Sequence, residues 1–278
     1  MALGGATQEK TVAPWRSGEK TIYSIGLSGI EIALARVSIG KFDSDSIVAR
    51  IASETLPSFS NILRVKDDIS SWISLEGLMP NRSNMHAIYK TRESTTKNEI
   101  VQTKGGIRLK QRVEALVPNK KDSRKKAKRA WSTTKRYPAK LHDPVSVLLS
   151  LRHREITSGQ SFDYFVMSGR KKYIAHLVAT GLESIRLNGR KMKAMRLQGN
   201  LQRTSGSRKL VRHGKVRNFS IWLETSGAKR ALKATIKSPL GAINIGLKQS
   251  SLGKQPVQAF SAPATLPEKL RQALPAKR

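Results

Sequence analysis

A single compact helix signal stands between two long stretches that alternate like β-strands, and this limits the folds open to the chain. Residues 141 to 159 read LHDPVSVLLSLRHREITSG. Asp143 can accept hydrogen bonds from the first free amides of a helix, and Pro144 suits the first helical position, where its missing N–H costs nothing. Arg152 lies in the last turn, where a cation complements the helix dipole. The pattern predicts a helix over 144–154 that is apolar around more than half of its circumference and is therefore buried.

The residues before this helix show the two-residue period of strands. Apolar side chains alternate with small or polar ones from Glu19 to Gly40, and the break at Ser28-Gly29 predicts two antiparallel strands joined by a tight turn. The stretch 59–78 is ambiguous, and we expect it to form strands broken at Lys66-Asp67-Asp68. The same patterns predict further strands at 46–54, 84–92, 97–102 and 107–113.

The strand pattern resumes after Ser158-Gly159. Asn188-Gly189 is a strong signal for a type I′ hairpin, and Ser168-Gly169 is a weaker turn signal. The segments FSIWLET, RALKATIKS and GAINIGLK then predict a terminal meander. We therefore expect a mainly β protein, a curved antiparallel sheet or partly open barrel packed around one short helix. Apolar positions in 22–34 and 173–178 could line a cavity inside it.

No linker divides the chain into two domains. We expect a flexible segment over 1–18, a single β-rich domain over 19–248 and a disordered tail over 249–278, where Ser, Pro, Ala, Gln and Lys dominate. Two strongly basic stretches, 119–140 and 203–217, are interpreted as loops of the domain.

Charge is the strongest functional signal. The 52 Lys and Arg residues face 19 Asp and Glu residues, for a net charge of +33. Such a field attracts nucleic acid, anionic lipid headgroups, lipopolysaccharide phosphates and acidic glycans without choosing among them. The residues expected to make the contact lie in the two basic stretches: Lys120, Lys121, Arg124, Lys125, Lys126, Lys128, Arg129, Trp131, Lys135, Arg136, Tyr137, Arg208, Lys209 and Arg212.

The sequence offers little to a catalytic hypothesis. It has no cysteine, and its five histidines show no metal-ligand spacing. The acidic pairs Asp43/Asp45 and Asp67/Asp68 are more typical of turns than of acid–base chemistry. We expect no catalytic residues, no metal and no cofactor. No apolar run approaches the roughly 20 residues that a transmembrane helix needs.

Several segments carry a resemblance to a known family. The helix segment DPVSVLLSLR, the strands GQSFDYFVMSGRKKYIAHLVATGLESIRLNG and the ending IWLET and LKATIKSPLGAINIGL resemble a bacterial family known only as domain of unknown function three-one-zero-eight, over about residues 19–248. The resemblance implies export to the envelope of Gram-negative bacteria, a curved barrel-like β structure and no established activity. We interpret the shared residues as determinants of the fold rather than of catalysis: Asp143, Pro144, Ser146, Arg152, Tyr173 and Trp222.

Three functional hypotheses remain open. The first is a non-enzymatic periplasmic protein that binds an anionic or amphiphilic envelope component. The second is a cytosolic nucleic-acid-binding protein, in which Trp131 and Tyr137 stack on bases. The third, an enzyme of cell-wall or lipid substrates, requires two carboxylates, or a His and a Ser, to meet in a cleft. Gly4 and Ala6 suit a signal cleavage site, so the amino terminus is interpreted as the stub of an export signal or as a small-residue tail.

Overall fold

The structure is a computed structural model that describes residues 11–103, 106–118, 126–137, 139–205, 211–212, 216–238 and 241–259. One α-helix, α1 (Pro144–His153), and one turn of 3-10 helix (Pro57–Phe59) accompany the strands in this part of the chain. The strands are β1 (Thr11–Ser17), β2 (Lys20–Leu27), β3 (Ile30–Lys41), β4 (Ser46–Thr55), β5 (Val65–Ser74), β6 (Pro80–Tyr89), β7 (Arg92–Thr103), β8 (Gly106–Pro118), β9 (Lys126–Tyr137), β10 (Leu141–His142), β11 (Ser161–Ser168), β12 (Lys171–Leu187), β13 (Arg190–Ser205), β14 (Val211–Arg212), β15 (Arg217–Glu224), β16 (Ala231–Ser238), β17 (Gly241–Ser251) and β18 (Gln255–Ala259).

Sixteen of these strands form one sheet, in which two antiparallel meanders are joined edge to edge. The first meander runs from β2 to β9, and the second runs from β11 through β13 and β15 to β17. Strand β17 pairs with β2, which joins the two meanders, and β1 pairs with β18 in a separate two-stranded sheet. Among the described strands, no ladder joins β9 to β10. The sheet is thus strongly curved but not closed into a barrel, as the sequence predicts.

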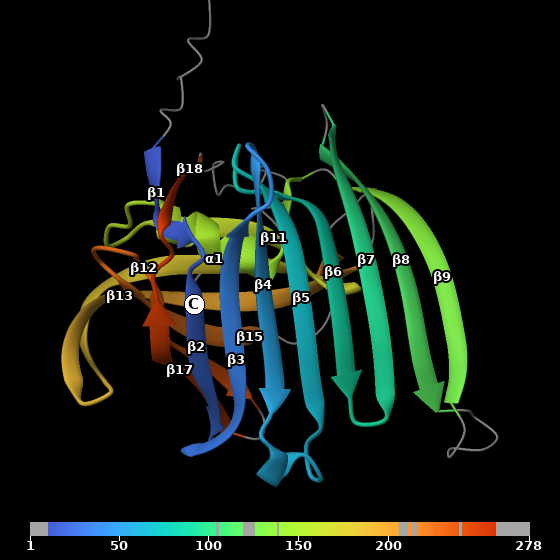
Figure 1. Cartoon of the computed structure of the whole chain (residues 1–278), viewed down its shortest axis with the longest axis horizontal. Helices are drawn as coiled ribbons and strands as arrows, with labels where there is room; N and C mark the ends of the chain where they lie inside the picture. The colour runs from blue at the N-terminus through green and yellow to red at the C-terminus, as the bar shows by residue number, and fades with distance from the viewer. Residues whose placement is uncertain are drawn as a thin grey trace, which may run out of the picture.

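The sheet bends into two layers that enclose the helix. In Figure 1, β2 to β9 stand side by side while β12, β13 and β15 cross behind them. One side of α1 presents Val145 and Leu149 to a core cluster that contains Trp15 of β1 and Ile47 of β4. The end of the helix presents Leu151 to a second cluster from β11, β12, β13 and β15. The helix is therefore the filling between the layers, which explains its largely apolar sequence.

The Asp-Pro signal produces the cap that it predicts. The Asp143 carboxylate accepts a hydrogen bond from the Ser146 amide (2.8 Å), and the Ser146 hydroxyl accepts one from the Asp143 amide (2.9 Å). Asp143 also accepts a hydrogen bond from Ser71 of β5, so the cap fixes the helix to the first layer. This reciprocal capping box satisfies amide donors that would otherwise be buried without partners.

Two terminal segments do not behave as expected. Strand β1 occupies part of the segment 1–18 that was expected to be flexible, and it buries Trp15 completely. The expected tail 249–278 instead continues β17 to Ser251 and forms β18, which pairs with β1. Both expectations are wrong for the described residues, because neither strand is self-evident in sequence and each depends on a partner about 240 residues away. Residues 1–10 and 260–278 lie outside the described residues.

Two expectations about basic and acidic segments are also wrong. Strand β9 runs through 126–137 and pairs with β8 along its whole length, where a basic loop was expected. Strand β5 begins at Val65 and includes Lys66-Asp67-Asp68, where a break between strands was expected. In both cases consecutive charged side chains lie within a strand, and the ladder with the neighbouring strand supplies the stabilisation that the local sequence lacks. In the second basic stretch, 203–217, the described residues belong mainly to β13, β14 and β15.

The short hairpins follow their sequence signals. Ser28 and Gly29 have φ of 51° and 88°, and Asn188 and Gly189 have φ of 47° and 79°. Positive φ at both central residues is the geometry of a type I′ turn, whose twist matches that of the flanking strands. Within the described residues, no helix has the length and apolar character needed to cross a membrane.

Candidate functional site

The two ends of the large sheet approach each other between β9 and the β11–β12 hairpin, and we call this region the seam. Part of the seam is closed by a core cluster in which Tyr137 packs against Phe165, with ring centroids 5.3 Å apart. Next to this core lies a group of polar and cationic residues that we name the seam site: Gln111, Trp131, Lys135, Arg170 and Lys172.

Strand β9 supplies Trp131 and Lys135. In the ladder with β8, Trp131 lies opposite Val113 and Lys135 lies opposite Leu109. Directly paired residues project from the same face of a sheet, and Val113 and Leu109 are both buried. The alternation of β9 therefore directs Trp131 and Lys135 to the inner face, the face that carries the core.

The β11–β12 hairpin supplies Arg170 and Lys172. Gly169 in its turn has a φ of 55°, and a Cβ atom at that position would lie only 2.8 Å from the sulfur of Met85. A glycine here thus lets the turn pack closely on β6. The Arg170 guanidinium then lies over the ring of Trp131, with Cζ 4.4 Å from the ring centroid, which is a cation–π contact between the two ends of the sheet.

A chain of buried amides positions Lys172. The Asn98 side chain donates to the Ser83 hydroxyl (3.1 Å), and Gln111 Nε2 donates to the Asn98 side-chain oxygen (2.7 Å) and to the Gly169 carbonyl (3.1 Å). Gln111 then has its own side-chain oxygen free to accept from Lys172 Nζ at 3.5 Å. This network, together with the Arg170 carbonyl that accepts from Lys172 Nζ at 3.1 Å, holds the ammonium group of Lys172 at the seam.

The electrostatic environment of the seam site disfavours the charge of Lys172. Burial, with the neighbouring charges of Lys135 and Arg170, lowers the pKa of Lys172 to about 8. Among the residues that the structure describes, none of these three cations forms an ion pair with a carboxylate. Three cations beside an aromatic ring can therefore bind an external anion, because no carboxylate of the described chain occupies that place.

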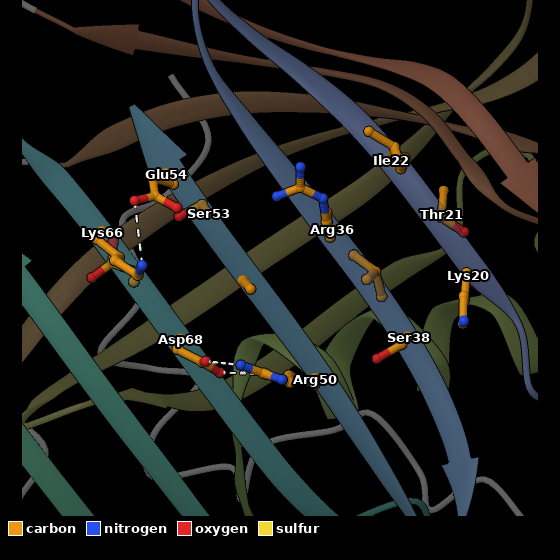
Figure 2. A pocket seen from close by; sticks show the side chains of 13 residues that line it. Lys20, Thr21, Ile22, Arg36, Ser38, Arg50, Ser53, Glu54, Lys66 and Asp68 are labelled. Atoms are coloured by element: carbon orange, nitrogen blue, oxygen red, sulfur yellow. Dashed lines mark hydrogen bonds and ion pairs between the residues drawn. The ribbon is translucent and has the colours of Figure 1, made fainter. Parts of the chain in front are cut away.

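A second candidate is a depression on the opposite side of the first layer, which we call the outer trough. It has a volume of about 420 Å³, and Figure 2 shows its side chains on β2, β3, β4 and β5. Ala52, which lines the trough, alternates with Ile51, which packs on the helix cluster, so the trough faces away from α1. It is lined by Lys20, Thr21, Ile22, Arg36, Val37, Ser38, Arg50, Ala52, Ser53, Glu54, Lys66, Asp67 and Asp68.

The charges of the outer trough are largely compensated. Arg50 pairs with Asp68 through two hydrogen bonds, which lower the pKa of that carboxyl, and Lys66 pairs with Glu54 at 3.3 Å. Figure 2 shows both pairs at the rim of the trough. Within the described chain only Lys20 and Arg36 of the lining cations have no hydrogen-bond or ion-pair partner. The trough is therefore a weaker anion site than the seam.

A Ser–His pair comes together in the helix cap. The Ser146 hydroxyl lies 3.4 Å from Nδ1 of His142, next to Asp143. All three residues are buried in the core, and burial lowers the pKa of His142 to about 3, so the ring is neutral. The pair does not lie in a cleft, and both Ser146 and Asp143 are engaged in the capping box, so we assign the group to the fold.

The other acidic and histidine groups form structural contacts. Asp43 accepts hydrogen bonds from the Asp45 amide (2.9 Å) and the Ser46 hydroxyl (2.8 Å), as expected for a turn. Asp163 and His176 face each other across β11 and β12 at 2.6 Å. No group of three His, Asp or Glu residues in the described part of the chain could hold a metal ion.

The predicted contact residues divide into three sets. Trp131 and Lys135 both lie at the seam, whereas Tyr137 is only 3% exposed in the core, so the prediction that it stacks on bases is wrong. Lys128, Arg129 and Arg136 are exposed on β9, and Lys126 and Arg212 belong to β9 and β14. The others lie outside the described residues: Lys120, Lys121, Arg124, Lys125, Arg208 and Lys209.

Sequence reasoning missed Gln111, Arg170 and Lys172. The only local signal is the basic triplet Arg170-Lys171-Lys172, which directly follows the Ser168-Gly169 turn signal. The predicted cavity lining is also wrong in part, since Ile174 and Leu177 belong to packed core clusters.

The shared motif residues have structural positions. Arg152 forms a buried ion pair with Glu19 at 2.9 Å, which joins the end of α1 to the start of β2. Trp222 is buried, and its indole N–H donates to Glu183 at 2.7 Å. Tyr173 is half-buried on β12 beside Lys172. Pro144 opens the helix behind the Asp143 cap.

Comparison with known proteins identifies a family. The family model described as "Protein of unknown function (DUF3108)" matches residues 21–248. No curated protein matches the chain. A beta-barrel-like protein of domain of unknown function DUF1849 from Brucella abortus is 9% identical, with a TM-score of 0.48, over 87% of this chain and 99% of that chain.

Two further solved structures show lower similarity. A putative exported protein with a YmcC-like fold from Bacteroides fragilis is 4% identical, with a TM-score of 0.36, over 87% of this chain and 100% of that chain. The hypothetical lipoprotein YmcC from Escherichia coli K12 is 12% identical, with a TM-score of 0.28, over 84% of this chain and 85% of that chain.

Proposed function

This chain belongs to the DUF3108 family, and from that premise we propose that it is a non-enzymatic protein of the bacterial envelope that binds an anionic, amphiphilic envelope component. The seam site binds the anionic headgroup of this component. A phosphate group is the chemistry that fits best, because several oxygens can accept hydrogen bonds from Lys135, Arg170 and Lys172 together.

The observation that supports this proposal is the group of three cations without a carboxylate partner. The burial of Lys172, and after it the charges of Lys135 and Arg170, disfavour the protonated ammonium group, which is why the pKa of Lys172 is lowered. A bound anion reverses the sign of the local field and stabilises the protonated form. The indole ring of Trp131, beside this group, gives the apolar part of an amphiphile a surface to pack on.

The experiment measures binding of inorganic phosphate, and of a phosphorylated glycolipid in detergent micelles, to the full chain by titration calorimetry. We expect Lys172→Met and Lys135→Met to weaken binding of both probes by about tenfold or more, since each removes a charge-assisted hydrogen bond. Arg36→Met is the matched control, because it removes an unpaired cation of the outer trough. Equal binding by wild type and both seam variants would overturn the proposal.

Nucleic acid serves as the competing ligand in the same assay. Salt dependence alone cannot separate the two functions, because every polyanion gives salt-sensitive binding. A single-stranded oligonucleotide that binds more tightly than the glycolipid, and that depends on the exposed residues Lys128 and Arg129 rather than on Lys172, would favour the nucleic-acid function.

The envelope location is tested separately by cell fractionation. The location follows from the export that the family resemblance implies, so we expect the protein in the periplasmic or membrane fraction of its host. A new amino terminus near Thr7 would show that a signal had been removed. Recovery of the full-length chain in the cytosolic fraction would contradict the location without altering the test of the seam site.

A further inference from the structure

The first meander has two ends with different chemistry. Because consecutive antiparallel strands reverse direction, the β2–β3, β4–β5 and β6–β7 connections all lie at one end, which is the lower end in Figure 1. We name residues 28–30, 56–64 and 89–92 at this end the lower rim. The β3–β4 and β5–β6 connections, residues 42–45 and 75–79, form the upper rim.

Each connection of the lower rim exposes one large apolar side chain. Ile30 is 58% exposed, Ile62 is 79% exposed and Tyr89 is 54% exposed. Isolated exposed apolar residues are normal on protein surfaces. These three, however, stand at three neighbouring connections. Connections at one end of the meander recur every second strand, so they lie about 10 Å apart.

The lower rim also carries unpaired cations. Arg64, Lys90 and Arg92 are exposed, and among the described residues none of them forms an ion pair. The Lys90 amide donates to the Arg64 carbonyl at 2.8 Å, so two of the connections are held together. The nearest carboxylates along the chain lie just inside the rim and face cationic or histidine partners: Glu31 with Lys248 (3.0 Å), Glu54 with Lys66 (3.3 Å) and Glu93 with His86 (3.6 Å).

The upper rim has the opposite charge. Its two connections contain Asp43, Asp45 and Glu76 and neither Lys nor Arg. Its exposed aromatic residue, Phe42, packs edge-on against Trp72 with ring centroids 6.4 Å apart. Among these connections, exposed apolar tips and unpaired cations thus occur together at the lower rim and not at residues 42–45 and 75–79.

We propose that the lower rim docks on the surface of an anionic lipid bilayer. Ile30, Ile62 and Tyr89 insert into the headgroup and upper acyl region, which is the depth that short apolar and aromatic tips reach. Arg64, Lys90 and Arg92 contact the lipid phosphates, in the way that basic residues beside a membrane bind an anionic leaflet. The inference does not depend on the seam site, because the two surfaces share no residue.

The first experiment uses the fact that the chain has no cysteine. A single Ile62→Cys variant is labelled with a polarity-sensitive dye, and a Phe42→Cys variant carries the same dye on the upper rim. We expect vesicles of equal parts phosphatidylglycerol and phosphatidylcholine to shift the emission of the dye at Ile62 to the blue and to leave that at Phe42 unchanged. Equal shifts at both positions, or no shift at Ile62, would overturn the proposal.

The second experiment measures vesicle flotation of unlabelled variants. Replacing Arg64, Lys90 and Arg92 together by Gln is expected to weaken binding to the phosphatidylglycerol vesicles by about a hundredfold at low salt. Each basic residue near an anionic surface contributes a factor of about five, and the three factors multiply. Replacing Ile30, Ile62 and Tyr89 together by Ser is expected to weaken it by at least about tenfold.

Controls separate this surface from the alternatives. Arg36→Met should bind vesicles like wild type, because it removes an unpaired cation that belongs neither to the lower rim nor to the seam site. Wild-type binding to phosphatidylcholine alone at the same strength would show that the cations play no part, and would contradict the proposal. Self-association that competes with vesicles and is lost in the Ser variant would show that a second copy is the partner instead.

Discussion

Glu19→Gln is expected to destabilise the protein by about 3 to 5 kcal/mol, because it leaves a buried guanidinium without its counter-charge. Glu19 and Arg152 are each only 2% exposed, and their charged atoms lie 2.9 Å apart. Arg152 also donates from Nε to the Ala228 carbonyl at 3.1 Å. The ion pair thus joins the end of α1, the start of β2 and the β15–β16 connection.

The size of this loss in stability follows because removing one charge of a buried pair costs much more than removing both charges. A buried ion pair gains little over apolar residues of similar size, whereas a single buried charge retains its full cost of desolvation. The double variant Glu19→Met with Arg152→Met should therefore recover most of the stability that either single variant loses. The cycle should give a coupling energy of about 2 kcal/mol or more.

Urea unfolding followed by circular dichroism measures these differences. In a domain of this size, about 3 to 5 kcal/mol corresponds to a fall in Tm of roughly 10 °C. The matched control is Lys66→Gln, which breaks the exposed pair with Glu54 and should cost less than about 1 kcal/mol. A loss below about 1 kcal/mol for Glu19→Gln would refute the reasoning, because it would mean that water solvates the guanidinium of Arg152.

Three further predictions test the core and the seam. Burial lowers the pKa of His142 from 6.5 to about 3 in the folded state. Between pH 6.5 and pH 3 the unfolded chain therefore binds a proton at this residue that the folded chain does not. Stability should therefore fall as the pH drops from 6.5 towards 3, by up to about 1.4 kcal/mol per pH unit, and the His142→Gln variant should lack this slope in urea unfolding at each pH. Gly199→Ala places a Cβ 2.4 Å from the ring of Phe219 and should cost about 1 to 3 kcal/mol in thermal melts, whereas Gly246→Ala, with its nearest atom at 3.5 Å, should be close to neutral. Competitive acylation followed by mass spectrometry should give Lys172 an apparent pKa of about 8, and added phosphate should raise this pKa.

Local signals in the sequence predict the local parts of this fold. The Asp143-Pro144 pair and the apolar run behind it contain everything that a capped, buried helix needs, and the capping box forms as expected. Ser28-Gly29 and Asn188-Gly189 are favoured because few other residue pairs adopt two positive φ angles. The curved sheet around the helix follows from these elements, since an apolar helix between amphipathic strands has to be enclosed by them.

The strands that sequence reasoning missed are those that depend on distant partners. In β9, Trp131, Thr133, Lys135 and Tyr137 do follow the two-residue period, but the cations between them are equally typical of a solvated loop. Only the ladder with β8 decides between these interpretations. The seam site is hidden for the same reason, because β8, β9 and the β11–β12 turn bring together residues up to about sixty positions apart.

A strongly basic composition does not by itself identify a binding surface, so the groups that surround the unpaired cations have to be considered too. On the outer face of β4 and β5, the ladder places Asp68 beside Arg50 and Glu54 beside Lys66, so that positive charge is neutralised locally. At the seam and at the lower rim the described cations have no such partner, although an acidic side chain there would relieve their repulsion at once. Two groups of such cations are distinguished by their neighbours, one partly buried beside an aromatic ring and one beside exposed apolar tips. An anionic headgroup suits the first and a lipid surface suits the second.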